Sequence, residues 1–216
     1  MERVGKSANT FTDRTFAIVD VETSGTSAVF NRVIEIGILR IENGVCIETY
    51  RTCVDPGQSI SPWITALTGI QQEELEGAPL FEDIIDDVER LLAGAIFVAH
   101  NASFDYAFIQ KEFGRAGRRF SAKRLCTVRL SRALFPRSKH HDLSSLIKRH
   151  GFACESRHRA FDDAAVLWDF LQLCERMHGE KLAPALAKII RSKPTFLEIE
   201  FQRCIAQQND DEPVIS

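Results

Sequence analysis

Hydrophobic and polar residues alternate or cluster in three early segments of the chain in ways that predict β-strands. The segments 15–21, 33–41 ("VIEIGILRI") and 45–54 ("VCIETYRTCV") are rich in apolar and β-branched residues. The tripeptide "ENG" at 42–44 separates the last two and predicts a tight hairpin turn. The chain is therefore expected to begin with antiparallel strands.

The spacing of the apolar residues changes to a helical period after residue 80. The segment "LFEDIIDDVERLLAG" predicts an amphipathic helix, with apolar residues at 80, 81, 84, 85, 88, 91 and 92. The preceding stretch, 54–70, is rich in Pro and Gly and predicts a loop with one short helix.

A strand, a tight loop and a helix are expected to follow. The apolar run "AIFVAHN" at 95–101 predicts the strand, and "SFDYAFIQKEFGRAG" at 103–117 predicts the helix. Ser103 is the expected N-cap of this helix, and Gly114 or Gly117 is expected to end it.

The remaining chain predicts helices and a polar end. A capped helix is expected at 142–150, followed by Gly151, and further helices are expected at 160–177 and 182–191. The segment "QQNDDEPVIS" at 207–216 reads as a polar tail. Early strands followed by mixed strands and helices predict a layered α/β fold with a mixed sheet in one domain.

Composition supports a globular protein. The 216 residues are 44% hydrophobic, which is enough for a packed core. With no apolar run of 18 residues and no apolar segment of the secretion-signal kind, a cytoplasmic protein without membrane contact is expected. The six cysteines form no CxxC pair, which argues against a zinc site or a disulfide framework and favours small buried hydrophobic residues.

Charge is unevenly distributed along the chain. The net charge of −3 gives no global attraction to nucleic acid. Residues 73–89 hold eight acids and no base, whereas 111–132 hold eight Lys or Arg against Glu112 alone. The basic stretch fits a solvated surface, or the neighbourhood of a site that handles phosphate.

Asp20 and Glu22 end the first apolar segment, "FAIVDVETSG" at 16–25. Side chains alternate along a strand, so these two acids share one face and Val19 and Val21 share the other. Neighbouring like charges near an apolar strand require a cation or a raised pKa, and hard divalent ions bind such oxygen ligands. An exposed strand end whose acids face water is the alternative for a lone pair of this kind.

Asp105 is the second candidate, in the first turn of the helix that follows the short strand in "AHNASFDYAF". A helix dipole favours a carboxylate at this position, so Asp105 also fits an ordinary first-turn acid.

Asp163 is the third candidate, in "HRAFDDAAVLWDFLQLC". At helical spacing it falls in the apolar stripe, whereas Asp162 falls on the wet side. The apolar partners of Asp163 in that stripe are Val166, Leu167, Phe170, Leu171 and Cys174. His158, five residues earlier, would lie near Asp163 and is a candidate general base, although a lone His also fits an ordinary surface or core position.

The three motifs D-x-E-T-S-G, H-N-A-x-F-D and H-x-x-x-x-D, in this order, resemble those of the DEDDh 3′→5′ exonucleases. This DnaQ-like group includes polymerase proofreading subunits, and the resemblance covers about residues 14–176. It implies a ribonuclease H-like fold with a central mixed five-stranded sheet flanked by helices. "LCTVRLSRALFP" looks like the mid-domain helix of that family. The expected division is an N-terminal extension (1–13), an exonuclease domain (14–178) and a C-terminal helical extension with the tail (179–216).

The resemblance also implies the roles of the acids and the histidine. Asp20, Glu22, Asp105 and Asp163 would hold two Mg²⁺ or Mn²⁺ ions, and His158 would deprotonate the attacking water.

Further residues match family positions around the terminal nucleotide, although most also fit a simple loop with a tight turn. The expected substrate-binding residues are Thr23, Leu67, Gly69, Ile70 and Phe104. Leu67 and Ile70 would offer apolar surface beneath a base, and Phe104 would either enter the core or wedge against the substrate. His100 and Asn101 are expected to organise their loop, and His140 and His141 to lie at the surface.

The expected function is a metal-dependent 3′→5′ exonuclease that releases nucleoside 5′-monophosphates from 3′ ends of nucleic acid, foremost single-stranded DNA. A DNA polymerase or a repair protein is a possible partner. The alternatives are an RNA 3′-end exonuclease of the RNase T or oligoribonuclease type, and a non-catalytic nucleic-acid-binding module.

Overall fold

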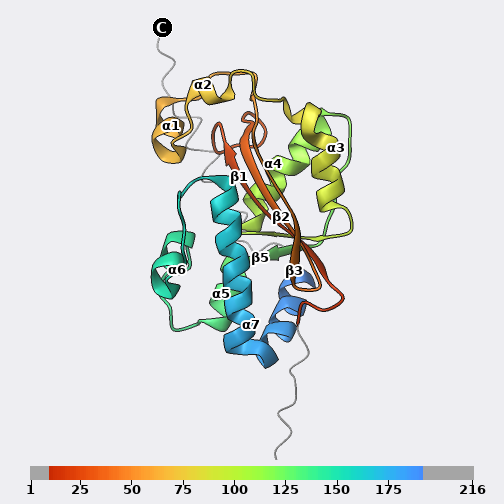
Figure 1. Ribbon diagram of the computed structural model, residues 1–216, viewed down its shortest axis with the longest axis vertical. Coiled ribbons are helices and arrows are strands. Elements are labelled where there is room, and N and C mark those ends of the chain that lie inside the picture. The colour runs from red at the N-terminus through yellow and green to blue at the C-terminus, as the bar shows by residue number, and fades with distance from the viewer. Residues whose placement is uncertain (1–9, 192–216) are drawn as a thin grey trace, which may run out of the picture.

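Five strands form one mixed sheet at the centre of the molecule, in a computed structural model that describes residues 10–191 (Figure 1). In spatial order the strands are β3 (Val45–Cys53), β2 (Val33–Glu42), β1 (Thr15–Thr23), β4 (Ile96–Ala99) and β5 (Arg124–Cys126). The pairs β3–β2 and β2–β1 are antiparallel, and the pairs β1–β4 and β4–β5 are parallel. The predicted α/β fold with a mixed five-stranded sheet is confirmed.

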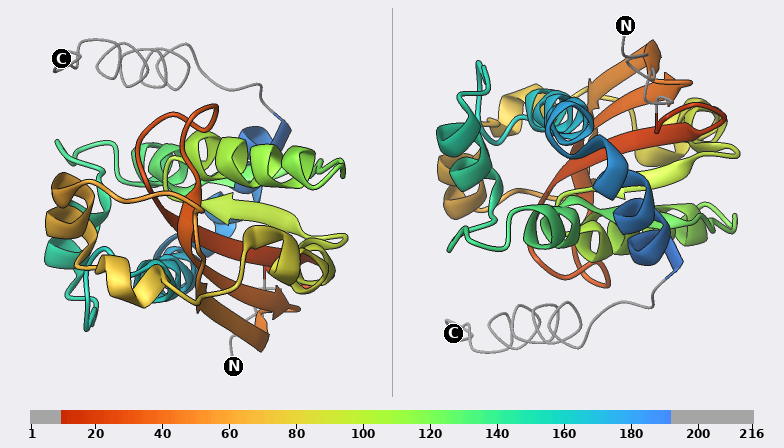
Figure 2. Two further views of the ribbon diagram at one scale, coloured as in Figure 1. Left: turned by 90° about the horizontal axis from the view of Figure 1, so that it is seen from above. Right: turned by 90° about the horizontal axis from the view of Figure 1, so that it is seen from below.

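Helices cover both faces of this sheet (Figure 2). The described helices are α1 (Pro62–Thr68), α2 (Gln72–Leu75), α3 (Phe81–Leu92), α4 (Ala102–Arg115), α5 (Thr127–Leu134), α6 (Leu143–His150) and α7 (Ala160–Arg191). None of them is both long enough and apolar enough to cross a membrane.

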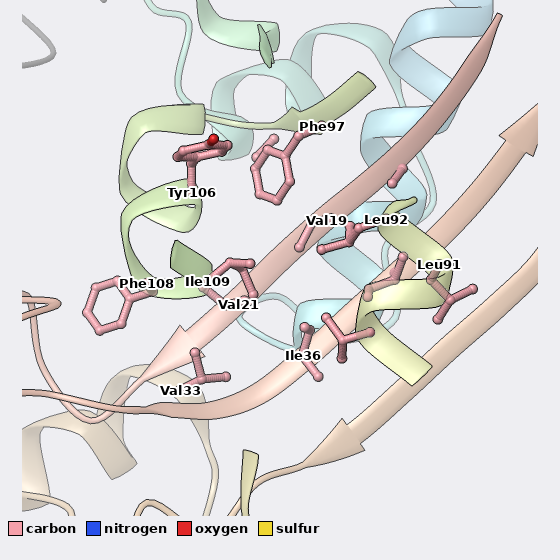
Figure 3. Close-up of a cluster of buried hydrophobic side chains, with 14 of the residues drawn as sticks. Val19, Val21, Val33, Ile36, Leu91, Leu92, Phe97, Tyr106, Phe108 and Ile109 are labelled. Carbon is pink, nitrogen blue, oxygen red and sulfur yellow. The ribbon is translucent and has the colours of Figure 1, made fainter. Parts of the chain in front are cut away.

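Strand β1 supplies apolar side chains to a core on each face of the sheet. Val19 and Val21 pack against α3 and α4, whereas Phe16 and Ile18 pack against α5, α6 and α7. Figure 3 shows part of the first core, with the labelled residues Val19, Val21, Val33, Ile36, Leu91, Leu92, Phe97, Tyr106, Phe108 and Ile109. The alternation expected for β1 is therefore present on both faces.

Most predicted elements are found within one or two residues of their expected bounds. The hairpin between β2 and β3 turns at Asn43 and Gly44, whose φ angles of 52° and 81° are the left-handed values that a type I′ turn needs. Gly117, with φ of 73°, follows the end of α4. Gly151 caps α6 in the left-handed conformation, as predicted.

Two local predictions differ from the structure. Helix α4 begins at Ala102, so its N-cap is Asn101, in the left-handed conformation, and not Ser103. Strand β5 was not located by the apolar pattern because it is only three residues long. It runs directly into α5, the helix that the family resemblance indicated.

Both ends of the described chain pack onto the domain. Helix α7 is interrupted at His178, whose φ of −135° is not helical, so the two predicted helices meet there. Leu182 and Leu186 beyond this kink are buried in the same core as Phe11, whose ring lies 5.4 Å from that of Trp168. The proposed domain boundaries stay a prediction, and residues 1–9 and the predicted polar tail lie outside the described residues.

Three arginines of the basic stretch 111–132 make contacts inside the protein. Arg118 pairs with Asp86 and Glu89 of α3 at 2.6 Å each, and the Arg124 guanidinium lies 4.6 Å from the centre of the Tyr106 ring. Arg115 donates to three backbone carbonyls of the β1–β2 loop. These contacts favour the reading of this stretch as protein surface.

Candidate active site

Asp20 and Glu22 extend the face of β1 that looks toward α7. They follow Phe16 and Ile18 at two-residue spacing, and both of those residues belong to the core beneath α7. The prediction that the two acids share one face, opposite Val19 and Val21, is therefore confirmed.

Asp105, on α4, lies beside the end of β1 that carries Asp20 and Glu22. It can do so because β1 extends beyond its neighbour β4. The pairing of β1 with β4 ends at Ile18 and Val98, so the end of β1 has no strand partner on that side. There the backbone N–H of Val21 donates to Asp105 Oδ1 at 3.3 Å. The left-handed backbone of Asn101 starts α4 directly after the strand and so brings its first turn beside β1.

The start of α7 approaches the sheet over Gly37 of β2, which is the register partner of Asp20. A Cβ atom at residue 37 would lie 2.5 Å from the Phe161 backbone nitrogen and 2.6 Å from the Ala160 carbonyl. Only glycine allows this approach, which places Asp163 beside the acids of β1.

Glu35, the register partner of Glu22, holds the chain segment that leads into α7. Its Oε1 accepts hydrogen bonds from Arg159 Nε at 2.9 Å and from another nitrogen of that guanidinium at 2.7 Å. Its Oε2 accepts from the Ala160 backbone N–H at 2.8 Å. A nearly buried carboxylate on the rigid sheet thus fixes the residues directly after His158.

His158 lies beside two of the acids. Ligand atoms of Glu22, His158 and Asp163 all lie within 4.8 Å of one another. The backbone of His158 has a φ of 62°, a left-handed conformation that non-glycine residues adopt at an energetic cost. The Glu35 contacts to the next two residues stabilise this conformation.

One pocket of about 360 Å³ brings together all five residues predicted to be reactive. It is lined by Asp20, Val21, Glu22, Thr26, His100, Asn101, Phe104, Asp105, Leu143, Arg157, His158 and Asp163. Asp162 does not line this pocket, in agreement with its predicted position on another side of the helix.

Burial and mutual repulsion raise the pKa values of the acids. Burial raises the pKa of Asp20 well above its ordinary value and the pKa of Glu22 to about 8. The negative charges of neighbouring acids contribute to the rise for both residues. Burial also raises the pKa of Asp105 to about 7 and increases that of Asp163. The pKa of His158 is lowered, first by its own burial and then by the Arg157 charge. The imidazole therefore favours its neutral form, which can accept a proton.

The acidic pocket fits divalent cations. Four carboxylates with raised pKa values line one pocket, so a positive charge in it would relieve their repulsion. Carboxylate oxygens are the ligands that Mg²⁺ and Mn²⁺ prefer.

The predictions for His100, His140 and His141 are partly confirmed. His100 Nδ1 lies 2.9 Å from Thr127 Oγ1, which ties the loop after β4 to the start of α5, and burial lowers the His100 pKa to about 4. His140 is exposed, as predicted. His141 is half-buried, with Nδ1 at 2.8 Å from Ser131 Oγ, and so is not simply a surface residue.

The predicted substrate-binding residues are not all placed to meet a substrate. Ile70 is fully buried beside Ile34 and Ile64, so the expectation that it offers surface to a base does not fit this structure. The Thr23 hydroxyl donates to the Gly25 carbonyl at 2.6 Å and organises its own loop.

Three others keep positions compatible with substrate contact. Leu67 is exposed on α1, and Gly69 caps that helix in the left-handed conformation. Phe104 lines the pocket and lies 4.9 Å from the Phe108 ring, so it has both a packed side and a side toward the site.

Sequence reasoning missed Glu35 and Arg157. Glu35 carries a signal, since an acid in the apolar run "VIEIG" needs a buried cationic or N–H partner. Arg157, which forms an ion pair with Asp163, carries no such signal because an arginine in a polar loop is ordinary.

Comparisons with known proteins agree with this geometry. The protein-family model RNase_T, described as "Exonuclease", matches residues 17–171. The protein named 3'-5' exonuclease DinG of Staphylococcus epidermidis is 39% identical over 151 residues, and that of Staphylococcus saprophyticus is 37% identical over the same length. Each match covers 69% of this chain but only 17% of the relative, so the chain spans a small part of the length of these relatives.

Solved structures share the fold. The zinc-ion-bound complex of Escherichia coli ExoI with single-stranded DNA has a TM-score of 0.71 at 19% identity, covering 79% of this chain and 42% of that one. Exonuclease X in complex with 5′-overhanging duplex DNA has a TM-score of 0.60 at 25% identity, covering 79% of this chain and 99% of that one.

The sheet order, the helices on both faces and the acids at the end of the central strand define a domain of the ribonuclease H-like class. The chain belongs to the RNase_T exonuclease family, and the resemblance to DEDD-type exonucleases is confirmed.

Proposed function

We propose that this domain is a 3′→5′ exonuclease that hydrolyses the terminal phosphodiester bond of single-stranded DNA and releases nucleoside 5′-monophosphates. The observation that carries the proposal is the convergence of Asp20, Glu22, Asp105, Asp163 and His158 in one pocket. These residues come from β1, α4, the segment before α7 and the first turn of α7, and the fold has to bring them together from distant parts of the chain.

Asp20, Glu22, Asp105 and Asp163 would hold two Mg²⁺ or Mn²⁺ ions, with Asp20 contributing to both. When bound, such ions supply charge stabilisation for the attacking and leaving oxygens of the phosphodiester. The strand and helix positions of the four acids keep their carboxylates fixed, which favours a rigid site.

His158 would act as the general base. Its neutral imidazole accepts a proton from the attacking water, whose oxygen forms the new bond to phosphorus while the bond from phosphorus to the 3′ oxygen breaks. The leaving 3′ oxygen takes a proton from solvent and the imidazolium returns its proton to solvent, so the products are a shortened strand and a nucleoside 5′-monophosphate. The Glu35 contacts to Arg159 and Ala160 support the position of this imidazole.

Several features support DNA ends as the substrate. Phe104 offers an aromatic face beside Asp105, and stacking of this kind binds bases without reading their sequence. The similar DinG proteins are named 3'-5' exonucleases, and the ExoI and exonuclease X structures with the same fold hold DNA. A polymerase or repair partner stays a prediction.

A substrate panel tests the proposal. End-labelled single-stranded DNA, duplex DNA, RNA and dinucleotides are incubated at equal enzyme concentration with Mg²⁺, with Mn²⁺ and with EDTA. We expect stepwise shortening of single-stranded DNA from the 3′ end, abolished by EDTA. A strong preference for RNA would overturn the substrate assignment, and nucleotide binding without turnover in either metal would overturn the enzymatic one.

Adjacent aspartates provide a matched pair of variants for the site. Asp163→Asn should lower turnover by more than about 100-fold, because even residues behind a metal ligand commonly contribute about 10- to 100-fold. Asp162→Asn removes the same charge from the neighbouring position outside the pocket and should leave turnover within about twofold. Equal activities of the two variants would contradict the assigned site.

A further inference from the structure

Two arginines flank His158, and their surroundings differ. Arg159 donates from two nitrogens to Glu35, which is a well-satisfied pair anchored on the sheet. Arg157 instead points to Asp163, one of the four acids of the pocket. Arg159 therefore has a clear structural task, whereas the contact of Arg157 falls on a candidate metal ligand.

The Arg157 guanidinium is held by few contacts. One nitrogen donates to Asp163 Oδ2, and another lies 3.4 Å from Ser144 Oγ. Its Nε is buried without a hydrogen-bond partner among the described residues. The side chain lines the pocket and keeps 28% of its surface exposed to solvent.

The positive charge of Arg157 also opposes the mutual repulsion of the four acids that line the pocket. These acids, Asp20, Glu22, Asp105 and Asp163, are called the acidic cluster below. Burial raises the pKa values of Asp20, Glu22 and Asp163, and the Arg157 charge works against that rise for all three. Among the described residues that line the pocket, it is the one lysine or arginine. A single guanidinium thus partly neutralises several carboxylates at once.

We propose that Arg157 is a built-in counter-cation of the metal-free acidic cluster and competes with a divalent ion for Asp163. This inference rests on the proposed metal site. It assigns Arg157 a role before the substrate arrives, since the guanidinium stabilises the empty cluster and has to release Asp163 when an ion binds.

The competition follows from the shared carboxylate. An oxygen that accepts a charge-assisted hydrogen bond from a guanidinium is not free to act as a full metal ligand. Two positive charges next to one carboxylate also repel each other. The observed metal affinity is then reduced by the fraction of molecules in which Asp163 is already released.

Arg157→Gln tests this role without relying on catalysis. Mn²⁺ binding is measured by calorimetry in the absence of nucleic acid, and thermal unfolding is measured in EDTA. We expect Mn²⁺ to bind about tenfold more tightly to the variant. This is the change expected if Asp163 is released from Arg157 in about one parent molecule in ten. In EDTA at about pH 8 the variant should unfold at least about 4 °C lower, since an unpaired acid remains in the cluster.

Arg137→Gln is the matched control, because Arg137 is exposed and lies outside the pocket. This variant removes the same charge and should change neither the Mn²⁺ affinity nor the unfolding temperature in EDTA. Equal Mn²⁺ affinities of the parent and Arg157→Gln would overturn the role of Arg157 while leaving the metal site standing. Absence of Mn²⁺ binding to the parent would overturn the metal site and this inference with it.

Arg157→Lys decides the matter if the glutamine variant does not fold in EDTA. Lysine keeps the charge without the planar fork of donors. Retained folding, with Mn²⁺ affinity within about threefold of the parent, would support the counter-cation role. Loss of folding despite the retained charge would overturn it.

Discussion

Glu35 and Arg159 form an ion pair with two hydrogen bonds across 124 positions of the chain. The same carboxylate accepts the Ala160 backbone N–H, so β2 is connected directly to the start of α7. His158 immediately precedes this anchored segment and has a left-handed backbone with a φ of 62°. Glu35 is therefore a positioning residue for His158, although it does not line the pocket.

Glu35→Gln should lower kcat by about 10- to 100-fold with little change in KM, because a displacement of a reacting group by about 1 Å has effects of this size. Loss of the charged pair should also lower the free energy of unfolding by about 2 kcal/mol. Steady-state kinetics and denaturant unfolding measure the two effects.

Glu48→Gln is the control for that variant. Glu48 also pairs with an arginine through two bonds, to Arg90 at 2.8 and 2.7 Å, but this pair is exposed and lies elsewhere. Its activity should stay within about twofold of the parent, since exposed ion pairs contribute little. A similar loss of kcat in both variants would contradict a specific role for Glu35.

Gly37→Ala should misplace α7. The added Cβ would lie 2.5 Å from the Phe161 nitrogen, a contact with backbone that cannot turn aside. We expect a loss of about 1–3 kcal/mol in stability, as for overpacked sites, together with reduced turnover because Asp163 moves with the helix. Gly114→Ala is the control, because a Cβ there meets no atom within 4 Å. That variant should be as stable as the parent or slightly more stable.

His158→Ala should lower turnover by about 10²- to 10⁴-fold, the range usual for loss of a general base. Calorimetry should show Mn²⁺ binding that is still measurable, because the four carboxylates remain. The acid limb of the pH–rate profile should change in the variant, since the group that accepts the proton is gone. A parental rate in this variant would exclude His158 as the base.

The free energy of unfolding of the metal-free protein should decrease as the pH rises. The pKa values of Glu22 and Asp105 are about 8 and about 7 in the folded protein, well above their values of about 4 in an unfolded chain. The folded state therefore binds these protons more tightly, and their contribution to stability is complete below about pH 4 and is lost as pH rises through both folded values.

Thermal unfolding in EDTA checks this, with a lower midpoint expected at about pH 9 than at about pH 6. Added Mg²⁺ replaces the protons, so the increase in midpoint that it causes should be larger at the higher pH. Asp105→Asn, whose amide has no proton to release in this pH range, should show a shallower dependence. A metal-induced shift that is the same at both pH values would contradict the raised pKa values.

The sequence pattern was informative where the apolar residues on either side of a candidate residue showed which face of its strand or helix it occupies. Alternation along β1 placed Asp20 and Glu22 on one side, and the apolar stripe of α7 placed Asp163 inward, because burial imposes a period on strands and helices. Asp105 was found by its motif and its first-turn position.

Pairings across long separations were not accessible from the pattern. Nothing local to Glu35 indicates Arg159, and nothing local to Gly37 indicates the backbone of Phe161, because both contacts depend on how α7 returns to the sheet. Ile70 was misjudged for the same reason, since its burial depends on contacts with Ile34 of β2.

The long reach of the Glu35–Arg159 contact has a consequence for biosynthesis. During translation, a ribosome-bound chain that carries β1 and α4 but ends before His158 lacks both His158 and Asp163. We expect such a nascent chain to be inert toward the RNA that surrounds it. Nuclease competence would then arise only once α7 has emerged and docked on the sheet.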